Sequence, residues 1–161
     1  FEAVTAHTTR AAEKLRQNGL VAGTLTVFFH TNRHKQDRPQ YAASRSIQLS
    51  PMSCDTFELV RAARQCAGAA WPKANSHQYG FTKAGVMLDD LLPIEKRPLT
   101  LFDVADKKPN PAVEALDHIN RRFGKKAITL GSEGVQRSWK MRSEYRSPRY
   151  TTRISDLPIV R

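Results

Sequence analysis

The order of apolar and polar residues in the first part of the chain predicts two helices and three strands. Strong helix formers fill the first segment, and Asn18-Gly19 follows as a stop signal. β-branched and aromatic residues are typical of strands, and they fill the stretch that comes next. The predicted elements are a helix over 2–17, strands over 22–30 and 41–49, a helix over 55–71 and a strand over 79–88.

The strands are amphipathic, which predicts a sheet with one covered face. Leu25, Val27 and Phe29 share a face by the two-residue period of a strand. On the strand over 41–49, small polar residues including Ser44 and Ser46 occupy one face, whereas Arg45 shares the other with apolar neighbours. The helix over 55–71, capped by Ser53 or Asp55, has its apolar face from Phe57 to Trp71. This pattern predicts an α+β fold: an antiparallel sheet backed on one face by two helices, with its other face open.

The second part of the chain has a different composition. A polar stretch with two prolines, Asp106 to Pro111, separates the two parts. Apolar residues at helical spacing predict a helix over 111–123, and a short strand is expected over 127–130. Beyond position 135 there is little periodicity. The predicted organisation is a domain over 1–92, a linker over 93–110, and a basic α+β or irregular region over 111–161.

The charge balance points to a polyanion as partner. The chain has 161 residues, with 26 Lys+Arg against 15 Asp+Glu and a formal net charge of +11. Residues 106–161 hold 13 basic and 6 acidic side chains, so the second part is the more positive. Arginines alternate with aromatics there, which suits phosphates and unpaired bases, although a solvated tail is the alternative. The candidate contacts in this tail are Arg137, Trp139, Lys140, Arg142, Arg149, Tyr150 and Arg153.

Several kinds of chemistry have no support in the sequence. The five histidines are scattered, so no metal site is expected. Asp89 and Asp90 are adjacent, and because neighbours in a strand point to opposite faces, this pair alone cannot form a two-metal site. Cys54 and Cys66 form neither a disulfide scaffold nor a nucleophilic site. No run of apolar residues is long enough to span a membrane, and we expect a cytoplasmic protein without a secretory signal.

Three stretches carry a resemblance to a known family. Residues 79–88, YGFTKAGVML, resemble the last strand of the little-finger domain in Y-family translesion DNA polymerases. The strings SEGVQRSWKMR and SPRYTTRISDLPIVR resemble the C-terminal region of the UmuC type of this family, and residues 11–16 resemble the first little-finger helix. The resemblance spans essentially the whole chain. The palm, fingers and thumb of the family are not represented, and the family's little finger has a further strand before the first helix.

The resemblance implies a four-stranded sheet, of which this chain contributes three or four strands, with its open face toward template-primer DNA. It implies contacts mainly to phosphates, so that binding depends on salt and little on sequence. An ordinary solvated side chain is the alternative for each candidate. These DNA-binding candidates are Arg33, His34, Lys35, Arg38, Ser44, Arg45, Ser46, Thr82 and Lys83.

A second site follows from the same resemblance. The segment Pro98-Leu99-Thr100-Leu101-Phe102 is similar to the pentapeptide by which bacterial polymerases bind the sliding clamp. Leu101 and Phe102 would be the apolar anchors in a pocket of the clamp. Pro98 departs from the pattern because the family favours glutamine there. Packing of these residues on the chain's own core is the alternative.

We therefore expect a noncatalytic part of an SOS-induced error-prone polymerase, without a cofactor of its own, whose parent enzyme uses Mg²⁺. The expected partners are DNA, the sliding clamp, a UmuD′-like dimer and the RecA filament, with no membrane and with a location at the bacterial nucleoid. One alternative is a protein-assembly module in which DNA contact is incidental. A generic RNA-binding domain is a third possibility, but no RNA-recognition signature is present.

Overall fold

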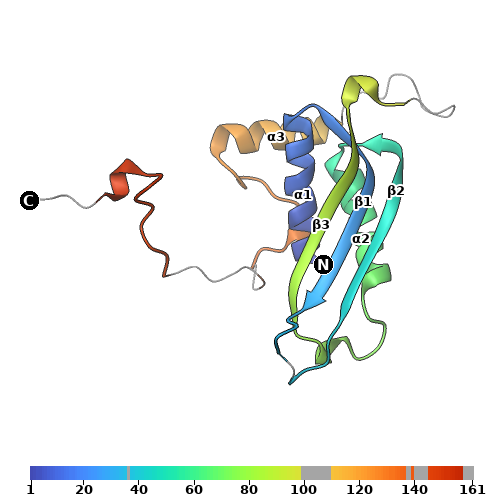
Figure 1. The fold of residues 1–161 in the computed structure, drawn as a ribbon. Coiled ribbons are helices and arrows are strands. Elements are labelled where there is room, and N and C mark those ends of the chain that lie inside the picture. The colour runs from blue at the N-terminus through green and yellow to red at the C-terminus, as the bar shows by residue number, and fades with distance from the viewer. Residues whose placement is uncertain (36, 99–109, 137–138, 140–144, 158–161) are drawn as a thin grey trace, which may run out of the picture.

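The computed structural model describes residues 1–35, 37–98, 110–136, 139 and 145–157. Within these ranges the longer elements follow one another as helix, two strands, helix, strand and helix (Figure 1). They are α1 (Glu2–Gln17), β1 (Leu20–Thr31), β2 (Ala42–Ser53), α2 (Thr56–Ala70), β3 (Phe81–Pro93) and α3 (Pro111–Phe123). Short 3-10 turns occur at Ser76–Gln78, Ile94–Lys96, Gly131–Glu133 and Ile154–Asp156.

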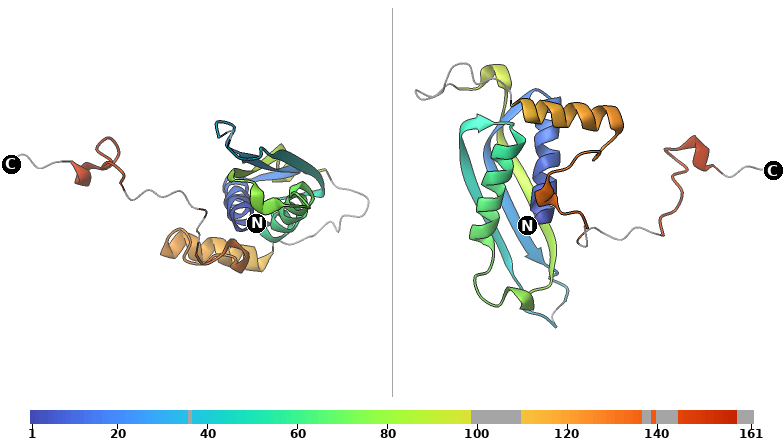
Figure 2. Two further views of the ribbon diagram at one scale, coloured as in Figure 1. Left: turned by 90° about the horizontal axis from the view of Figure 1, so that it is seen from below. Right: turned by 180° about the vertical axis from the view of Figure 1, so that it is seen from behind.

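The three strands form an antiparallel sheet in the order β2-β1-β3, so β1 is central and the other two are edges. Helices α1 and α2 lie side by side on one face of the sheet, as the two views in Figure 2 show, and they leave the other face open. The predicted α+β class and the two backing helices are confirmed. The helices over 2–17 and 111–123 begin and end at the predicted residues.

The core lies between the sheet and the two helices. Leu25, Val27 and Phe29 on β1 are buried, as their alternation predicts. Phe29 and Phe81 both contact the ring of Trp71, and the Trp71 and Phe81 rings stack with centroids 4.7 Å apart. Rings with offset or tilted contacts add stability beyond the area that they bury. This aromatic cluster closes the end of the core at which α2 terminates.

Helix α2 begins where the sequence predicts and buries the predicted face, except at Phe57. The Asp55 carboxylate accepts hydrogen bonds from the backbone N–H groups of Phe57 (2.7 Å) and Glu58 (3.1 Å), so Asp55 is the N-cap. The prediction that Phe57 lies on the buried face is wrong, since its side chain is 37% exposed. Leu59 and the predicted row of small residues, including Ala63 and Ala67, form the buried face. Their small size lets the helix approach the strands closely.

Both edge strands are longer than predicted. Strand β3 continues past residue 88 through Asp89 and Asp90 because both residues remain opposite β1, where Thr24 pairs with Asp89. Asp90 has a φ of 53°, and its carboxylate accepts a hydrogen bond of 2.5 Å from the Thr24 hydroxyl. Strand β2 continues to Ser53 across an irregularity opposite Gly23, which holds the cis Ser50–Pro51 peptide. Polar residues and prolines interrupt the alternation of apolar positions in both stretches, so the sequence pattern did not predict either extension.

The short strand expected over 127–130 does not form. Instead, Asn120 of α3 holds this segment against the helix by two hydrogen bonds to the backbone of Ile128. The amide Nδ2 donates to the Ile128 carbonyl, and the Ile128 N–H donates to Oδ1, each at 3.0 Å. The Asn120 amide thus satisfies both backbone groups of Ile128, as a neighbouring strand would in a sheet.

Candidate nucleic-acid interface

The open face of the sheet carries small polar side chains beside two larger apolar ones, Phe28 and Met87, and has almost no charge at its centre. Thr26 on β1 pairs with Ser46 on β2, and their hydroxyls form a hydrogen bond of 2.8 Å. Phe28 pairs with Ser44 on one side and Gly85 on the other. The structure therefore places the predicted residues Ser44 and Ser46 on the open face. Arg45 lies on the opposite face, where it pairs with Val27, so it does not join them.

The loop between β1 and β2 carries four of the predicted DNA-binding residues. Gln40 braces this loop: its amide donates to the carbonyls of Lys35 (2.6 Å) and Arg38 (3.1 Å). Its Oε1 in turn accepts a hydrogen bond of 2.7 Å from the Thr31 hydroxyl at the end of β1. The hydrogen bonds hold the backbone while the basic side chains stay exposed. These exposed side chains are Arg33, His34, Lys35 and Arg38.

Two shallow hollows lie where this loop meets the start of β3. One, of about 310 Å³, is lined by basic side chains from the end of β1, the loop and the start of β3, namely His30, Arg33 and Lys83. His30 and Lys83 are direct partners across β1 and β3. The other, of about 220 Å³, is lined by Lys35 and Arg38, and Thr82 lines both. The fold thus gathers the loop cations and β3 residues at one end of the open face, where a phosphate chain can meet several of them.

Two open-face residues were missed by the sequence analysis, Phe28 and His30. Their rings lie next to each other with centroids 5.2 Å apart. The signal was present, because the alternation that sends Leu25, Val27 and Phe29 inward sends the residues between them outward.

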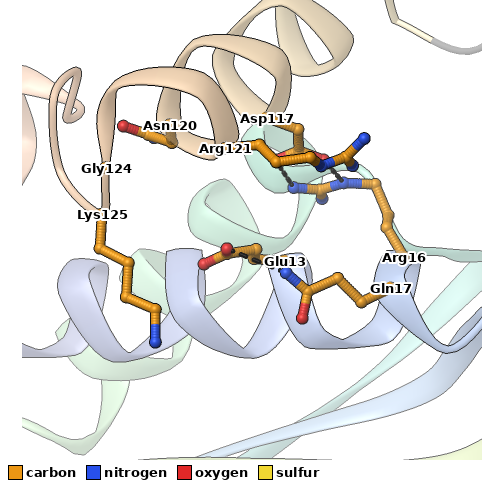
Figure 3. A pocket seen from close by; sticks show the side chains of 8 residues that line it. All are labelled: Glu13, Arg16, Gln17, Asp117, Asn120, Arg121, Gly124 and Lys125. Atoms are coloured by element: carbon orange, nitrogen blue, oxygen red, sulfur yellow. Dashed lines mark hydrogen bonds and ion pairs between the residues drawn. The ribbon is translucent and has the colours of Figure 1, made fainter.

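A second polar surface lies between α1 and α3 and ties the two parts of the chain together (Figure 3). Arg16 of α1 forms an ion pair with Asp117 of α3, with Nε and Nη2 donating to its two carboxylate oxygens at 2.7 and 2.8 Å. The remaining Nη1 donates to the Cys54 carbonyl (2.7 Å) and the Thr56 hydroxyl (2.9 Å). The hollow beside this pair, of about 320 Å³, has charges of both signs, which suits a packing seam better than an anion site.

The candidate residues of the C-terminal tail are spread out. Trp139 contacts His7 of α1, with ring centroids 5.8 Å apart. Partial burial, and then the charges of Arg10 and Lys126, lower the pKa of His7 below its ordinary value of 6.5. Arg149, Tyr150 and Arg153 are exposed. The other predicted contacts, Arg137, Lys140 and Arg142, lie outside the described residues, as do Leu99, Thr100, Leu101 and Phe102 of the predicted clamp peptide, whereas Pro98 is described and exposed.

The described residues offer little for covalent or metal chemistry. Burial raises the pKa of both thiols, Cys54 and Cys66, which keeps them protonated and weakly nucleophilic at neutral pH. Over the described ranges, no three His, Cys, Asp or Glu residues are grouped so as to hold a metal ion. In the same ranges, no helix has the length and apolar character that crossing a membrane requires.

The arrangement is that of a little-finger-type α+β domain: a basic loop and an open sheet face on one side, two helices on the other. Residues 1–101 match the family described as the impB/mucB/samB family C-terminal domain, and residues 112–160 match a domain of unknown function, DUF4113. The chain therefore belongs to the impB/mucB/samB family, as a fragment of the UmuC type of Y-family polymerase.

Individual relatives agree with this assignment. The chain is 34% identical to Protein UmuC of Salmonella typhimurium over 158 residues, which is 97% of this chain and 36% of that protein. It is 34% identical to Protein SamB of Salmonella typhimurium over 159 residues, 98% of this chain and 36% of SamB. It is 35% identical to Protein MucB of Escherichia coli over 162 residues, 98% of this chain and 36% of MucB. The chain thus spans about a third of the length of the curated relatives that it matches.

Proposed function

We propose that this chain is the DNA-holding and tethering part of an error-prone translesion DNA polymerase, with the polymerase chemistry located elsewhere in the parent protein. The observation that supports this most directly is the gathering of Arg33, Lys35 and Arg38 at one end of an open sheet face beside Lys83. Cations held on a braced loop can neutralise phosphates of template-primer DNA without reading its sequence. The Mg²⁺ of the parent enzyme is then bound by residues outside this chain.

The proposed DNA contact is testable by fluorescence anisotropy with a labelled primer-template over a range of salt concentrations. Each phosphate contact contributes about 0.9 to the slope of log affinity against log salt, so a variant with Arg33→Gln and Lys35→Gln should lower the slope by about 2. The matched control is Arg61→Gln with Arg64→Gln, which removes the same charge from exposed positions on α2. Equal slopes for both double variants, or no binding at low salt, would contradict the proposal.

We assign sliding-clamp tethering to residues 98–102. The support is the pattern Leu99, Leu101 and Phe102, whose side chains suit an apolar pocket, and the exposure of Pro98 at the end of the described domain. Calorimetry with the clamp of the host should show binding that is lost when Leu101 and Phe102 are both changed to Ala. Unchanged affinity would remove this peptide as the anchor.

The tail offers a second role, the docking of accessory proteins such as a UmuD′-like dimer or the RecA filament. Tyr145 is fully exposed and Ile154 is 88% exposed, so both side chains are available to a protein partner. This is the protein-assembly alternative. Deletion of residues 145–161 should weaken capture of the accessory dimer and leave the salt-dependent binding of primer-template at the sheet face intact. The reverse result would assign the tail to DNA.

A further inference from the structure

Phe28 is an aromatic side chain on the face of the sheet that the helices leave open. Its β1 neighbours on that face are Thr26 and His30, and across the strands it pairs with Ser44 and Gly85. The residues on both sides are therefore among the smallest that a strand can carry. They leave the half-buried ring accessible from the open side of the sheet.

The ring rests with its flat face on Gly85. A Cβ atom placed on this glycine would lie within 2.8 Å of three ring carbons, Cζ, Cε1 and Cε2. An atom at the edge of a ring would be close to one carbon and clearly farther from the next two, so the glycine lies beneath the ring. With one face of the ring against the backbone, the opposite face points away from the sheet.

A second ring, that of His30, and a cation, Lys83, lie near the Phe28 ring on the open face. The imidazole of His30 lies 5.2 Å from it, and Lys83 pairs with His30 two residues further along the strands. Two residues of strand span about 7 Å. That distance is close to the separation between a base and a neighbouring phosphate in an extended nucleotide chain. Met87, whose apolar side chain is 51% exposed, lies on the same face opposite Thr26, two residues along β3 from Gly85.

We propose that Phe28 is a stacking platform for an unpaired base, and that His30 and Lys83 hold the adjoining phosphate. This inference rests on the proposed DNA binding and adds that the chain holds an unpaired base at this point, such as one in the single-stranded part of a primer-template. Aromatic rings on open sheets bind bases of any sequence because every base has a π-face. No Asp or Glu lies on β1 or β2, and β3 carries none before Asp89, so a polyanion meets no repulsion near the ring.

The test compares two labelled oligonucleotides of equal length and charge with the full chain, an oligothymidylate and one whose sugars lack bases. The wild type should bind the oligothymidylate more tightly by about fivefold to 150-fold, the range for one stacked base. Phe28→Leu should abolish most of this preference without changing the salt slope, and Phe28→Tyr should retain it. Phe57→Leu, a change of the same kind at an exposed site on α2, is the control.

Lys83→Gln separates the platform from the proposed function as a whole. If Lys83→Gln lowers the salt slope while Phe28→Leu keeps the wild-type preference for bases, the platform is overturned and DNA binding stands. If the wild type binds neither oligonucleotide at low salt, both fail. Should Phe28→Leu not fold, Gly85→Ala provides the same test, because its added methyl group must displace the ring.

Discussion

Arg16 and Asp117, which are 101 positions apart, form a two-pronged ion pair that joins α1 to α3. Both side chains are 17% exposed, so the pair is largely withdrawn from water. Two parallel N–H···O bonds fix the relative orientation of the partners as well as attracting them. Arg16 lies in the region matched by the impB/mucB/samB family, and Asp117 lies in the region matched by DUF4113. The two regions are therefore joined by specific side chains as well as by the chain between them.

Removal of this pair should loosen α3. We expect Asp117→Asn to lower the free energy of unfolding by about 1–3 kcal/mol, because the Arg16 guanidinium loses a charged acceptor and faces an amide donor. Urea denaturation measures this change, and hydrogen exchange should show faster exchange across α3. Glu114→Gln removes the same charge from an exposed position on α3 and should cost only a few tenths of a kcal/mol. Equal losses of unfolding free energy in Asp117→Asn and Glu114→Gln would show that the ion pair stabilises the fold no more than an exposed charge does.

Two glycine-to-alanine changes should have opposite signs. At Gly85 the new methyl group meets the Phe28 ring, which must turn away, and we expect a loss of about 1 kcal/mol. At Gly68, inside α2, an added Cβ meets nothing within 4 Å, and alanine should stabilise the helix by about 0.5–1 kcal/mol. Thermal or urea unfolding measures the change in the free energy of unfolding for both glycine variants. Stabilisation at both sites would show that the ring does not rest on Gly85.

The sequence predicted what short-range patterns encode. The helix over 2–17, the Asp55 cap and the inward positions of Leu25, Val27 and Phe29 all follow from local propensity and period. The short strand over 127–130 was wrong because Asn120, a residue on another element, satisfies that backbone. Partnerships of this kind depend on which surfaces meet in three dimensions.

The candidate site shows the same limit. Alternation placed Ser44 and Ser46 on the open face and set Arg45 apart from them. The gathering of Lys83 with the loop cations depends on the strand order β2-β1-β3, which brings β3 beside β1. The contact of Phe28 with Gly85 depends on register, and a shift of one residue would have placed the ring elsewhere. Neither order nor register can be read from a single strand.

His7 should make stability depend on pH. Its pKa is lowered in the folded chain, chiefly by burial and then by Arg10 and Lys126, so protonation favours the unfolded state. The corresponding stability is present above the ordinary value of 6.5 and is lost as pH falls through the lowered pKa. Between about pH 7.5 and pH 5.5, the unfolding free energy should fall more for the wild type than for His7→Gln. Parallel pH profiles for the two proteins would contradict the prediction.

The acidic end of the open face should restrain DNA binding at low salt. Asp89 lies six residues along β3 from Lys83, about 20 Å away, and it faces Thr24 on β1. A phosphate chain that leaves the basic end along the strands approaches this carboxylate. Asp89→Asn should therefore tighten binding of primer-template by about twofold to threefold near 50 mM salt. The gain should disappear near 0.3 M salt, where the Debye length is below about 8 Å.

The comparison variant for this change is Glu114→Gln, which removes one negative charge from α3 on the helical side of the molecule. Both variants raise the net charge by one, so a general effect of charge would change their affinities equally. An effect specific to Asp89 requires that the DNA lie along the open face, because at about 0.1 M salt a charge acts over only about 10 Å. Anisotropy titrations at two salt concentrations, with the same labelled DNA, therefore report the path of the phosphate chain. Equal gains for Asp89→Asn and Glu114→Gln would mean that the DNA does not extend past Gly85 toward this end of the sheet.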